Sequence, residues 1–311
     1  MKILVDDYLG HITLDRMLPY LKLNGHIITK DLYDNPDVYL SSVRIRNNIK
    51  IPKILRLDSI YYNTDVNYKG MNDEILKSRL IANGIIYQSN YSRMLINDIL
   101  GNVKCKDIVI YNGIEKNWCG KFEEHDGINI TVTGKHRRHK RLKEIVELFL
   151  EYNIKYPNST LHIFGSLNDN KIIKHAKIKY YGFVKRKDMY DVLRITDFTL
   201  HLSKRDSCPN SVVEYIGAGI PVITTNNCGG TTEICKLTKG CTIVDGDGDY
   251  NDTSPVPHYG EKWNVLPLQV KNDLLEAMYE MTENKRRVDV PDDILISNVT
   301  DKYINFMREF I

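Results

Sequence analysis

The sequence lacks three features that would each place it in a distinct class of protein. Its 43 Lys and Arg residues nearly balance its 40 Asp and Glu residues, so the net charge is only +3. Proteins that hold nucleic acid mainly by charge usually carry a larger surplus. There is also no run of about 20 apolar residues and no long apolar stretch near the start, so the sequence predicts neither a membrane span nor a secretory signal.

Cysteine pairs and metal-ligand spacings are lacking too. The six cysteines include no Cys-x-x-Cys pair, which indicates reduced thiols in a cytoplasmic compartment rather than disulfides or a zinc site. An acidic series that begins at Asp245 has Tyr250 and Val256 where a calcium loop needs Gly and Glu. His136 and His139 lie among cations, with no carboxylate or thiol nearby in sequence, so they do not predict a metal site.

What the sequence does contain is an alternation of short apolar runs with helical patterns, which is typical of parallel sheets wrapped by helices. We expect two doubly wound, Rossmann-like α/β domains facing a cleft, at residues 1–118 and 119–290, with a polar linker near 113–126. Residues 291–311 are expected to form a helix that packs back toward the first domain. The expected strands are 2–7, 26–30, 53–58, 84–89 and 107–112, then 127–134, 159–165, 178–183, 198–202, 220–225 and 241–245.

Helical patterns lie between these strands and at the end of the chain. They are expected at residues 11–23, 140–156, 270–283 and 294–310. Pro19 predicts a kink or an early end of the first of these helices, because proline cannot donate the backbone hydrogen bond of a helix interior.

The segment RDSCPNSVVEYIGAGIPVITT, residues 205–225, carries the strongest signal of a site. Pro209 suits the first turn of a helix and Gly219 suits its end. A helix that begins beyond the carboxyl end of a strand presents N–H groups to an anion, most often a phosphate. Asp206 precedes this helix and Glu214 lies within it. A capped surface helix with a solvated glutamate would give the same pattern, so this segment alone leaves both interpretations open.

The segment TGKHRRHKRLK, residues 133–143, follows the first strand of the second domain. Gly134 permits a turn, and five Lys and Arg side chains crowd one short loop. Such side chains can clamp a diphosphate, with forked hydrogen bonds from Arg and a point charge from Lys. A nucleic-acid patch or a solvated helix start would also explain the loop, although extra cations are unfavourable at a helix N-terminus.

Two weaker segments also follow strands. Paired glycines in CGGTTE, residues 228–233, allow close approach of the backbone to a ligand, and Thr favours a helix start. Arg56 and Asp58, in LRLDS, could face the cleft or simply pair with each other. Ligands of open α/β sheets bind beyond the carboxyl ends of the strands, and all four segments lie at such ends.

Residues 127–233 resemble the donor-binding half of the retaining family 4 glycosyltransferases of the GT-B fold, with four matching segments in the family's order. The basic loop is similar to the family's phosphate loop, and RDSCPNSVVEYIGAGIPVI to its Glu-x7-Glu element. YYGFVKRKDMYDVLRITD, residues 180–197, and GGTTE resemble two further family segments. The first domain is similar more loosely, through NGH at 24–26, IIYQSNYS at 85–92 and VIYNGI at 109–114.

The resemblance implies roles for individual residues. Glu214 would hold the ribose hydroxyls of a nucleotide, and Asp206, which replaces the usual Glu, would contact the donor sugar. Arg137 and Lys140 would bind the diphosphate. Asp58 stands where many family members carry His, and would orient the acceptor hydroxyl or the donor sugar. The other donor-binding residues that the resemblance implies are Gly10, Gly134, Lys135, Gly165, Val184, Cys208, Pro209, Asn210 and Ser211.

We therefore expect a retaining, metal-independent transferase that moves a hexose-type sugar from a nucleoside diphosphate sugar to a glycan or another hydroxyl acceptor. A UDP-sugar is favoured over a GDP-sugar as donor, and no prosthetic group or nucleic acid is expected. Peripheral membrane contact by the first domain stays open. The alternatives are a sugar-nucleotide epimerase or hydrolase on the same fold, a nucleic-acid-binding protein that uses the basic loop, and a non-catalytic nucleotide-binding scaffold.

Overall fold

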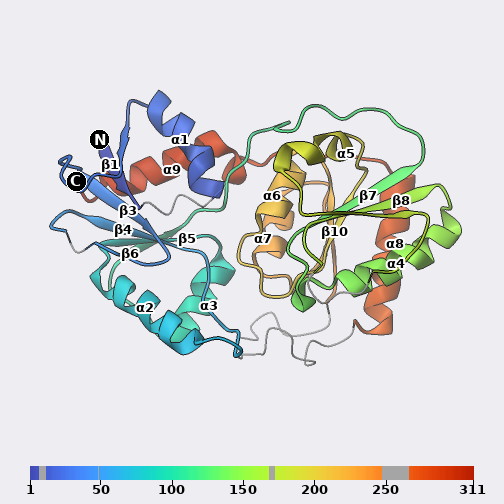
Figure 1. Ribbon diagram of the computed structural model, residues 1–311, viewed down its shortest axis with the longest axis horizontal. Helices are drawn as coiled ribbons and strands as arrows, with labels where there is room; N and C mark the ends of the chain where they lie inside the picture. The colour runs from blue at the N-terminus through green and yellow to red at the C-terminus, as the bar shows by residue number, and fades with distance from the viewer. Residues whose placement is uncertain (7–11, 48, 168–171, 247–265) are drawn as a thin grey trace. The chain divides into compact units, whose positions relative to one another are not determined.

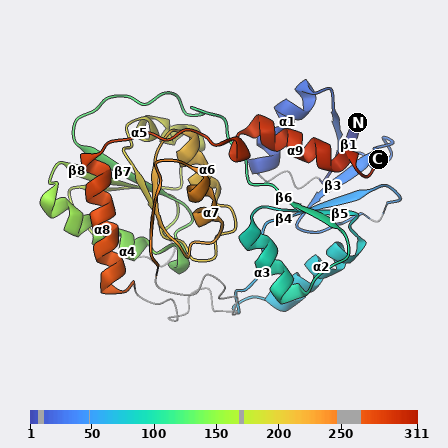
Figure 2. The same cartoon turned by 180° about the vertical axis from the view of Figure 1, so that it is seen from behind.

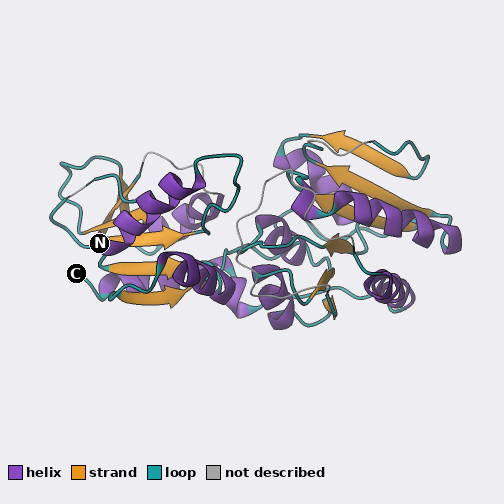
Figure 3. Cartoon of the chain, turned by 90° about the horizontal axis from the view of Figure 1, so that it is seen from below, coloured by secondary structure: helices purple, strands orange, loops and turns teal. Residues whose placement is uncertain are grey.

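The computed structural model describes residues 1–6, 12–47, 49–167, 172–246 and 266–311. Within these ranges the chain forms two compact units. Unit 1 comprises residues 1–114 and 291–311, and unit 2 comprises the described residues of 115–290. Both units contain strands and helices (Figure 3). No helix in the described ranges is both long enough and apolar enough to span a membrane.

Unit 1 is built on a six-stranded parallel sheet in the order β2-β1-β3-β4-β5-β6. Its strands are β1 Lys2–Val5, β2 Ile27–Thr29, β3 Val38–Ser42, β4 Lys53–Leu57, β5 Gly84–Tyr87 and β6 Lys106–Val109. Five of them confirm expected strands. The strand β3 was missed: its sequence VYLSS has only three apolar residues in succession, too few to show a period, yet all five residues are buried.

Two helices cover each face of this sheet (Figures 1 and 2). Helices α1 (Ile12–Leu23) and α9 (Ile296–Arg308) lie on one face, and α2 (Tyr68–Ile81) and α3 (Asn90–Leu100) lie on the other. Of the kink or early end expected at Pro19, the early end is wrong, because α1 continues to Leu23. Proline removes one helical hydrogen bond, but the burial of side chains of α1 in the same cluster as those of α9 keeps the last turn helical.

Unit 2 carries two three-stranded parallel sheets, β7-β8-β9 and β10-β11-β12. A parallel bridge between Ile130 and Phe198 places β7 beside β10, and Thr199 Oγ1 donates to the Thr131 carbonyl at 2.6 Å. The six strands thus follow the order β9-β8-β7-β10-β11-β12. Their bounds are β7 Ile128–Thr133, β8 Ser159–Phe164, β9 Ile178–Gly182, β10 Thr199–His201, β11 Val222–Thr225 and β12 Thr242–Val244, and all six confirm expected strands.

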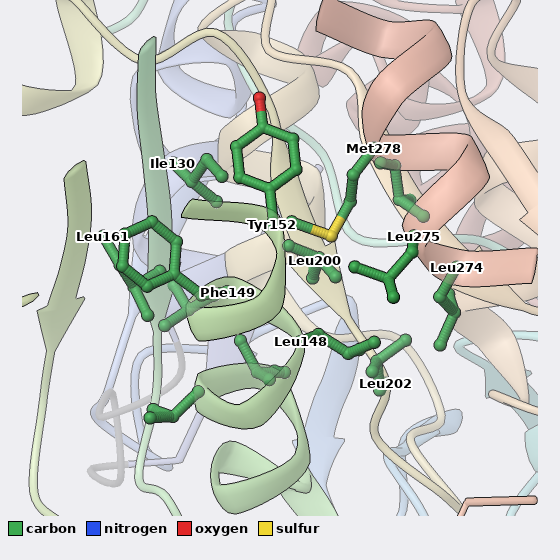
Figure 4. Packing of buried hydrophobic residues seen from close by; sticks show 14 of the residues in the cluster. Ile130, Leu148, Phe149, Tyr152, Leu161, Leu200, Leu202, Leu274, Leu275 and Met278 are labelled. Atoms are coloured by element: carbon green, nitrogen blue, oxygen red, sulfur yellow. The ribbon is translucent and has the colours of Figure 1, made fainter. Parts of the chain in front are cut away.

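The core of unit 2 lies between this sheet and two long helices. Side chains of α4 (Leu142–Lys155) and α8 (Leu268–Glu283) pack together against β7, β8 and β10 (Figure 4). The Tyr152 ring lies among apolar side chains while its hydroxyl reaches Thr282 Oγ1 at 2.5 Å. The shorter helices are α5 Tyr190–Arg194, α6 Asn210–Gly217 and α7 Gly230–Leu237, and the last two pack against β11. The strand order reverses between β7 and β10, which is where doubly wound folds bind ligands.

Candidate active site

The basic loop after β7 is tied to the end of β8. The backbone N–H of His136 donates to the carbonyl oxygen of Ser166, in the loop after β8, at 2.8 Å. His136 Nε2 lies 2.9 Å from the Phe164 carbonyl oxygen. The loop then forms a short 3-10 helix, Arg138–Lys140, before α4 begins. The buried imidazole thus anchors the loop, while Lys135 is exposed and Arg137 is half-buried at the carboxyl end of the sheet.

Three glycines bring the ends of β7, β8 and β9 into close contact. A Cβ atom on Gly165 would lie 1.9 Å from the carbonyl oxygen of Gly134, and the φ angle of Gly165 is +106°. Gly165 N donates to the Gly182 carbonyl at 2.7 Å. Only glycine fits this approach without displacing the backbone. The structure therefore joins Gly134 and Gly165, two of the residues singled out from the sequence.

Lys140 and Asp206 meet where the strand order reverses. Lys140 Nζ, from the loop after β7, donates to Asp206 Oδ2, from the loop after β10, and both side chains are mostly buried. His201 Nε2 lies 3.7 Å from the same carboxylate oxygen, and His201 Nδ1 lies 3.2 Å from Thr231 Oγ1. Burial raises the pKa of Asp206, but Lys140 and then His201 lower it more, so its pKa is below the usual value.

The first turn of α6 lies next to this cluster in sequence and follows the same loop. Residues Cys208–Ser211 lead from Asp206 into the helix, with Cys208 buried and Ser211 half-buried. The Asp206 carbonyl oxygen accepts from Gly230 N at 2.7 Å, which joins this loop to the start of α7. The Gly-Gly turn and the α6 segment therefore meet, and two helix N-termini flank Asp206.

Glu214 is held by two residues that sequence reasoning did not select. Arg186 Nε lies 3.4 Å from Glu214 Oε1, and its guanidinium stacks 3.9 Å over the ring of Trp118. Trp118 Nε1 donates to the Glu214 carbonyl at 2.7 Å. Val184 lies only two residues before Arg186, so the ion pair ties the segment after β9 to α6.

Asp58 lies in unit 1, just after β4, and its carboxylate accepts hydrogen bonds from side chains of the same unit. Arg56 Nη1 and Gln88 Nε2 both donate to Asp58 Oδ1. The side chain of Arg56 is only 1% exposed, whereas that of Asp58 is 36% exposed. The sequence left open whether Arg56 and Asp58 pair, and they do. Gly10 lies outside the described residues.

Comparison with known proteins identifies a family that part of the chain matches. Residues 120–250 match the family described as "Glycosyl transferases group 1". The chain is a glycosyltransferase. No curated protein matches its sequence.

Solved structures show that the glycosyltransferase has the GT-B fold. Anabaena HepE in complex with UDP-glucose is 12% identical, with a TM-score of 0.63 over 99% of this chain and 100% of HepE. AviGT4, a glycosyltransferase involved in avilamycin A biosynthesis, is 12% identical, with a TM-score of 0.58 over 100% of this chain and 98% of AviGT4. A glycosyltransferase from Rickettsia africae is 13% identical, with a TM-score of 0.58 over 99% of this chain and 97% of its own.

Three side chains of the candidate site were missed from the sequence. His201 sits in the strand β10, where a buried histidine gives no pattern of its own. Trp118 lies in the segment interpreted as a linker, although it is one of only two tryptophans, and burying such a ring usually signals a structured contact. Arg186 lies within the segment 180–197, but its sequence context gives it no role, because only the fold brings it to Glu214.

Buried histidines should make the glycosyltransferase lose stability in acid. Burial lowers the pKa of His136 and His162 to about 4 and that of His201 to about 3, against about 6.5 in an unfolded chain. Below pH 6.5 these imidazoles therefore bind protons in the unfolded chain but stay neutral in the folded chain. The free energy of unfolding falls as pH drops from 6.5 toward 4. Each histidine contributes up to about 1.4 kcal/mol per pH unit in that window.

Thermal unfolding between pH 7.5 and pH 4.5 tests this expectation. His162→Gln should flatten the acid loss, since His162 is buried, whereas His175→Gln, at an exposed histidine, should leave the slope unchanged. A midpoint temperature that stays level or rises between pH 7 and pH 5 would contradict the prediction.

Proposed function

We propose that this glycosyltransferase moves a hexose-type sugar from a UDP-sugar to a hydroxyl group of a glycan acceptor. The transfer would retain the configuration at the anomeric carbon and need no metal ion. The observation that carries the proposal is the cluster of Lys140, Asp206 and His201 at the strand reversal of unit 2. It lies within the group 1 match, beside the glycine-lined strand ends. The complexes of Anabaena HepE with UDP-glucose and with UDP support the choice of base.

The reaction requires positive charge near the leaving group. Negative charge builds on the diphosphate while the sugar becomes oxocarbenium-like, so preorganised donors lower the barrier. Lys140 carries three N–H donors, and Asp206 takes one of them, so the ammonium is fixed in place with donors left for a phosphate. Arg137 and the first turn of α6, at Asn210 and Ser211, would supply further hydrogen bonds.

The other proposed roles assign residues to the parts of the donor and to the acceptor. Glu214, fixed by Arg186, would accept hydrogen bonds from the ribose hydroxyls, and Val184 would lie near the base. Asp206 would contact the transferred sugar while Lys140 contacts the phosphates. Asp58 would accept the hydrogen bond of the acceptor hydroxyl that attacks the sugar. Gly134, Lys135 and Gly165 would border the diphosphate.

A thermal-shift series with UDP, GDP, ADP and their glucose conjugates tests the proposal without a known acceptor. A ligand at 100 times its dissociation constant stabilises the fold by about 2.7 kcal/mol. We expect UDP and UDP-glucose to raise the unfolding temperature and GDP and ADP to have little effect. The shift should persist in EDTA, and UDP release should require an acceptor hydroxyl.

Three outcomes would change the proposal. No shift with any nucleotide would contradict a donor site. A shift or turnover that disappears in EDTA and returns with Mg²⁺ would contradict the metal-free mechanism. Rapid consumption of UDP-glucose without acceptor would favour the epimerase or hydrolase alternative.

A further inference from the structure

A buried guanidinium connects the last helix of the chain to Asp58. Arg56 Nε donates to the hydroxyl of Tyr303, on α9, at 3.0 Å, and Arg56 Nη2 donates to Asn112 Oδ1 at 2.8 Å. Its third nitrogen, Nη1, donates to Asp58. Tyr303 is 0% exposed, and it lies 247 residues from Arg56 in sequence. Each guanidinium nitrogen thereby donates to a different residue, one on α9 and two in loops after strands.

This arrangement fixes the direction of the Asp58 carboxylate. A charge as buried as that of Arg56 needs a counterion and oriented dipoles, because desolvation is costly. Asp58 supplies the counterion, while Tyr303 and Asn112 supply the dipoles that stop the guanidinium from rotating away. Gln88 binds the same oxygen, Oδ1, and Ser92 Oγ donates to the Asp58 main-chain carbonyl at 2.9 Å.

We infer that Tyr303 is a positioning residue for sugar transfer: through Arg56 it holds the Asp58 carboxylate in the orientation that receives the acceptor hydroxyl. The inference rests on the role of Asp58 in the proposed function. It makes α9 part of the reaction machinery as well as a cover of the sheet. In an isolated surface ion pair the carboxylate could adopt several orientations. Here the hydrogen bond from Arg56 to Tyr303 fixes the guanidinium that binds Asp58.

The test is Tyr303→Phe, which removes one hydroxyl and leaves the ring packed in α9. A displacement of the reacting group by about 1 Å can cost about 100-fold, so we expect kcat for transfer from UDP-glucose to methyl glucosides to fall about 10- to 100-fold. The KM for UDP-glucose, and the dissociation constant and stoichiometry of UDP, should stay unchanged. The control is Thr300→Val on the same helix, because this equally buried hydroxyl donates within its own helix, to the Ile296 carbonyl oxygen at 2.7 Å. That variant should keep the kcat of the native protein.

Two companion variants separate the possible failures. Gln88→Met removes another donor to Asp58 Oδ1 and should also lower kcat with unchanged UDP binding, which keeps the test informative if Tyr303→Phe folds poorly. If Asp58→Asn loses transfer while Tyr303→Phe and Gln88→Met keep full kcat, the positioning role is overturned and the proposed function stands. If Asp58→Asn itself keeps full kcat, the acceptor role of Asp58 is wrong. If the native protein does not bind UDP, the proposed donor site is wrong.

Discussion

Lys140→Met is expected to lower kcat for sugar transfer by about 100- to 1000-fold, the effect of removing one preorganised donor from a developing oxyanion. Asp206 holds the ammonium of Lys140 at the strand reversal, so the variant removes an oriented cation from that point. Pyrophosphate binding should weaken as well, because the proposed contact is to the phosphates. Steady-state kinetics and calorimetric titration with pyrophosphate measure the two effects.

Stability must be separated from catalysis in this experiment. Removal of Lys140 leaves the Asp206 carboxylate without its cation, which destabilises the fold. The loss should be smaller than the about 3–5 kcal/mol typical of a fully buried pair, because both groups keep some solvent contact. The double variant Lys140→Met with Asp206→Asn should recover the unfolding temperature but not the rate. Lys143→Ala, at an exposed lysine in the first turn of α4, should keep both. Full activity in Lys140→Met would show that the diphosphate does not lie beside this residue.

Glu214→Gln is expected to weaken UDP binding about 10- to 100-fold. A hydrogen bond to a charged group contributes about 1.5–3 kcal/mol, and the change removes the charge while it keeps the shape of the side chain. Arg186 also loses its ion partner, so the ribose subsite loses order as well as charge. Calorimetric titration with UDP gives the dissociation constant directly.

Pyrophosphate provides an internal control for this variant because it lacks the ribose. Glu214→Gln should bind pyrophosphate as the native protein does, the reverse of the pattern expected for Lys140→Met. Glu151→Gln, at an exposed glutamate of α4, should change neither affinity. Equal loss of UDP and pyrophosphate binding in Glu214→Gln would indicate a general disturbance of α6 rather than a ribose contact.

The strands and helices of unit 2 could be predicted because apolar runs and turn residues in its sequence indicate the same element bounds. Short apolar runs bounded by Gly, Pro and polar turns predicted all six strands, and Pro209 and Gly219 marked the ends of α6. Signals of unit 1 were weaker where packing decides the outcome. Only burial in the middle of a sheet makes VYLSS the strand β3, and only packing beside α9 carries α1 past Pro19.

The sequence by itself determined the class of fold, the positions of most strands, and the loops that carry charge and glycine. Those features depend on residues close together in the chain, where propensity, periodicity and turn chemistry act. The tertiary structure alone decided which side chains meet. Lys140 and Asp206 are 66 residues apart, and the order of the strands brings their loops together. Likewise Arg56 reaches Tyr303 because α9 returns to the sheet of unit 1. Long-range pairings of this kind follow from strand order and packing, which no local pattern encodes.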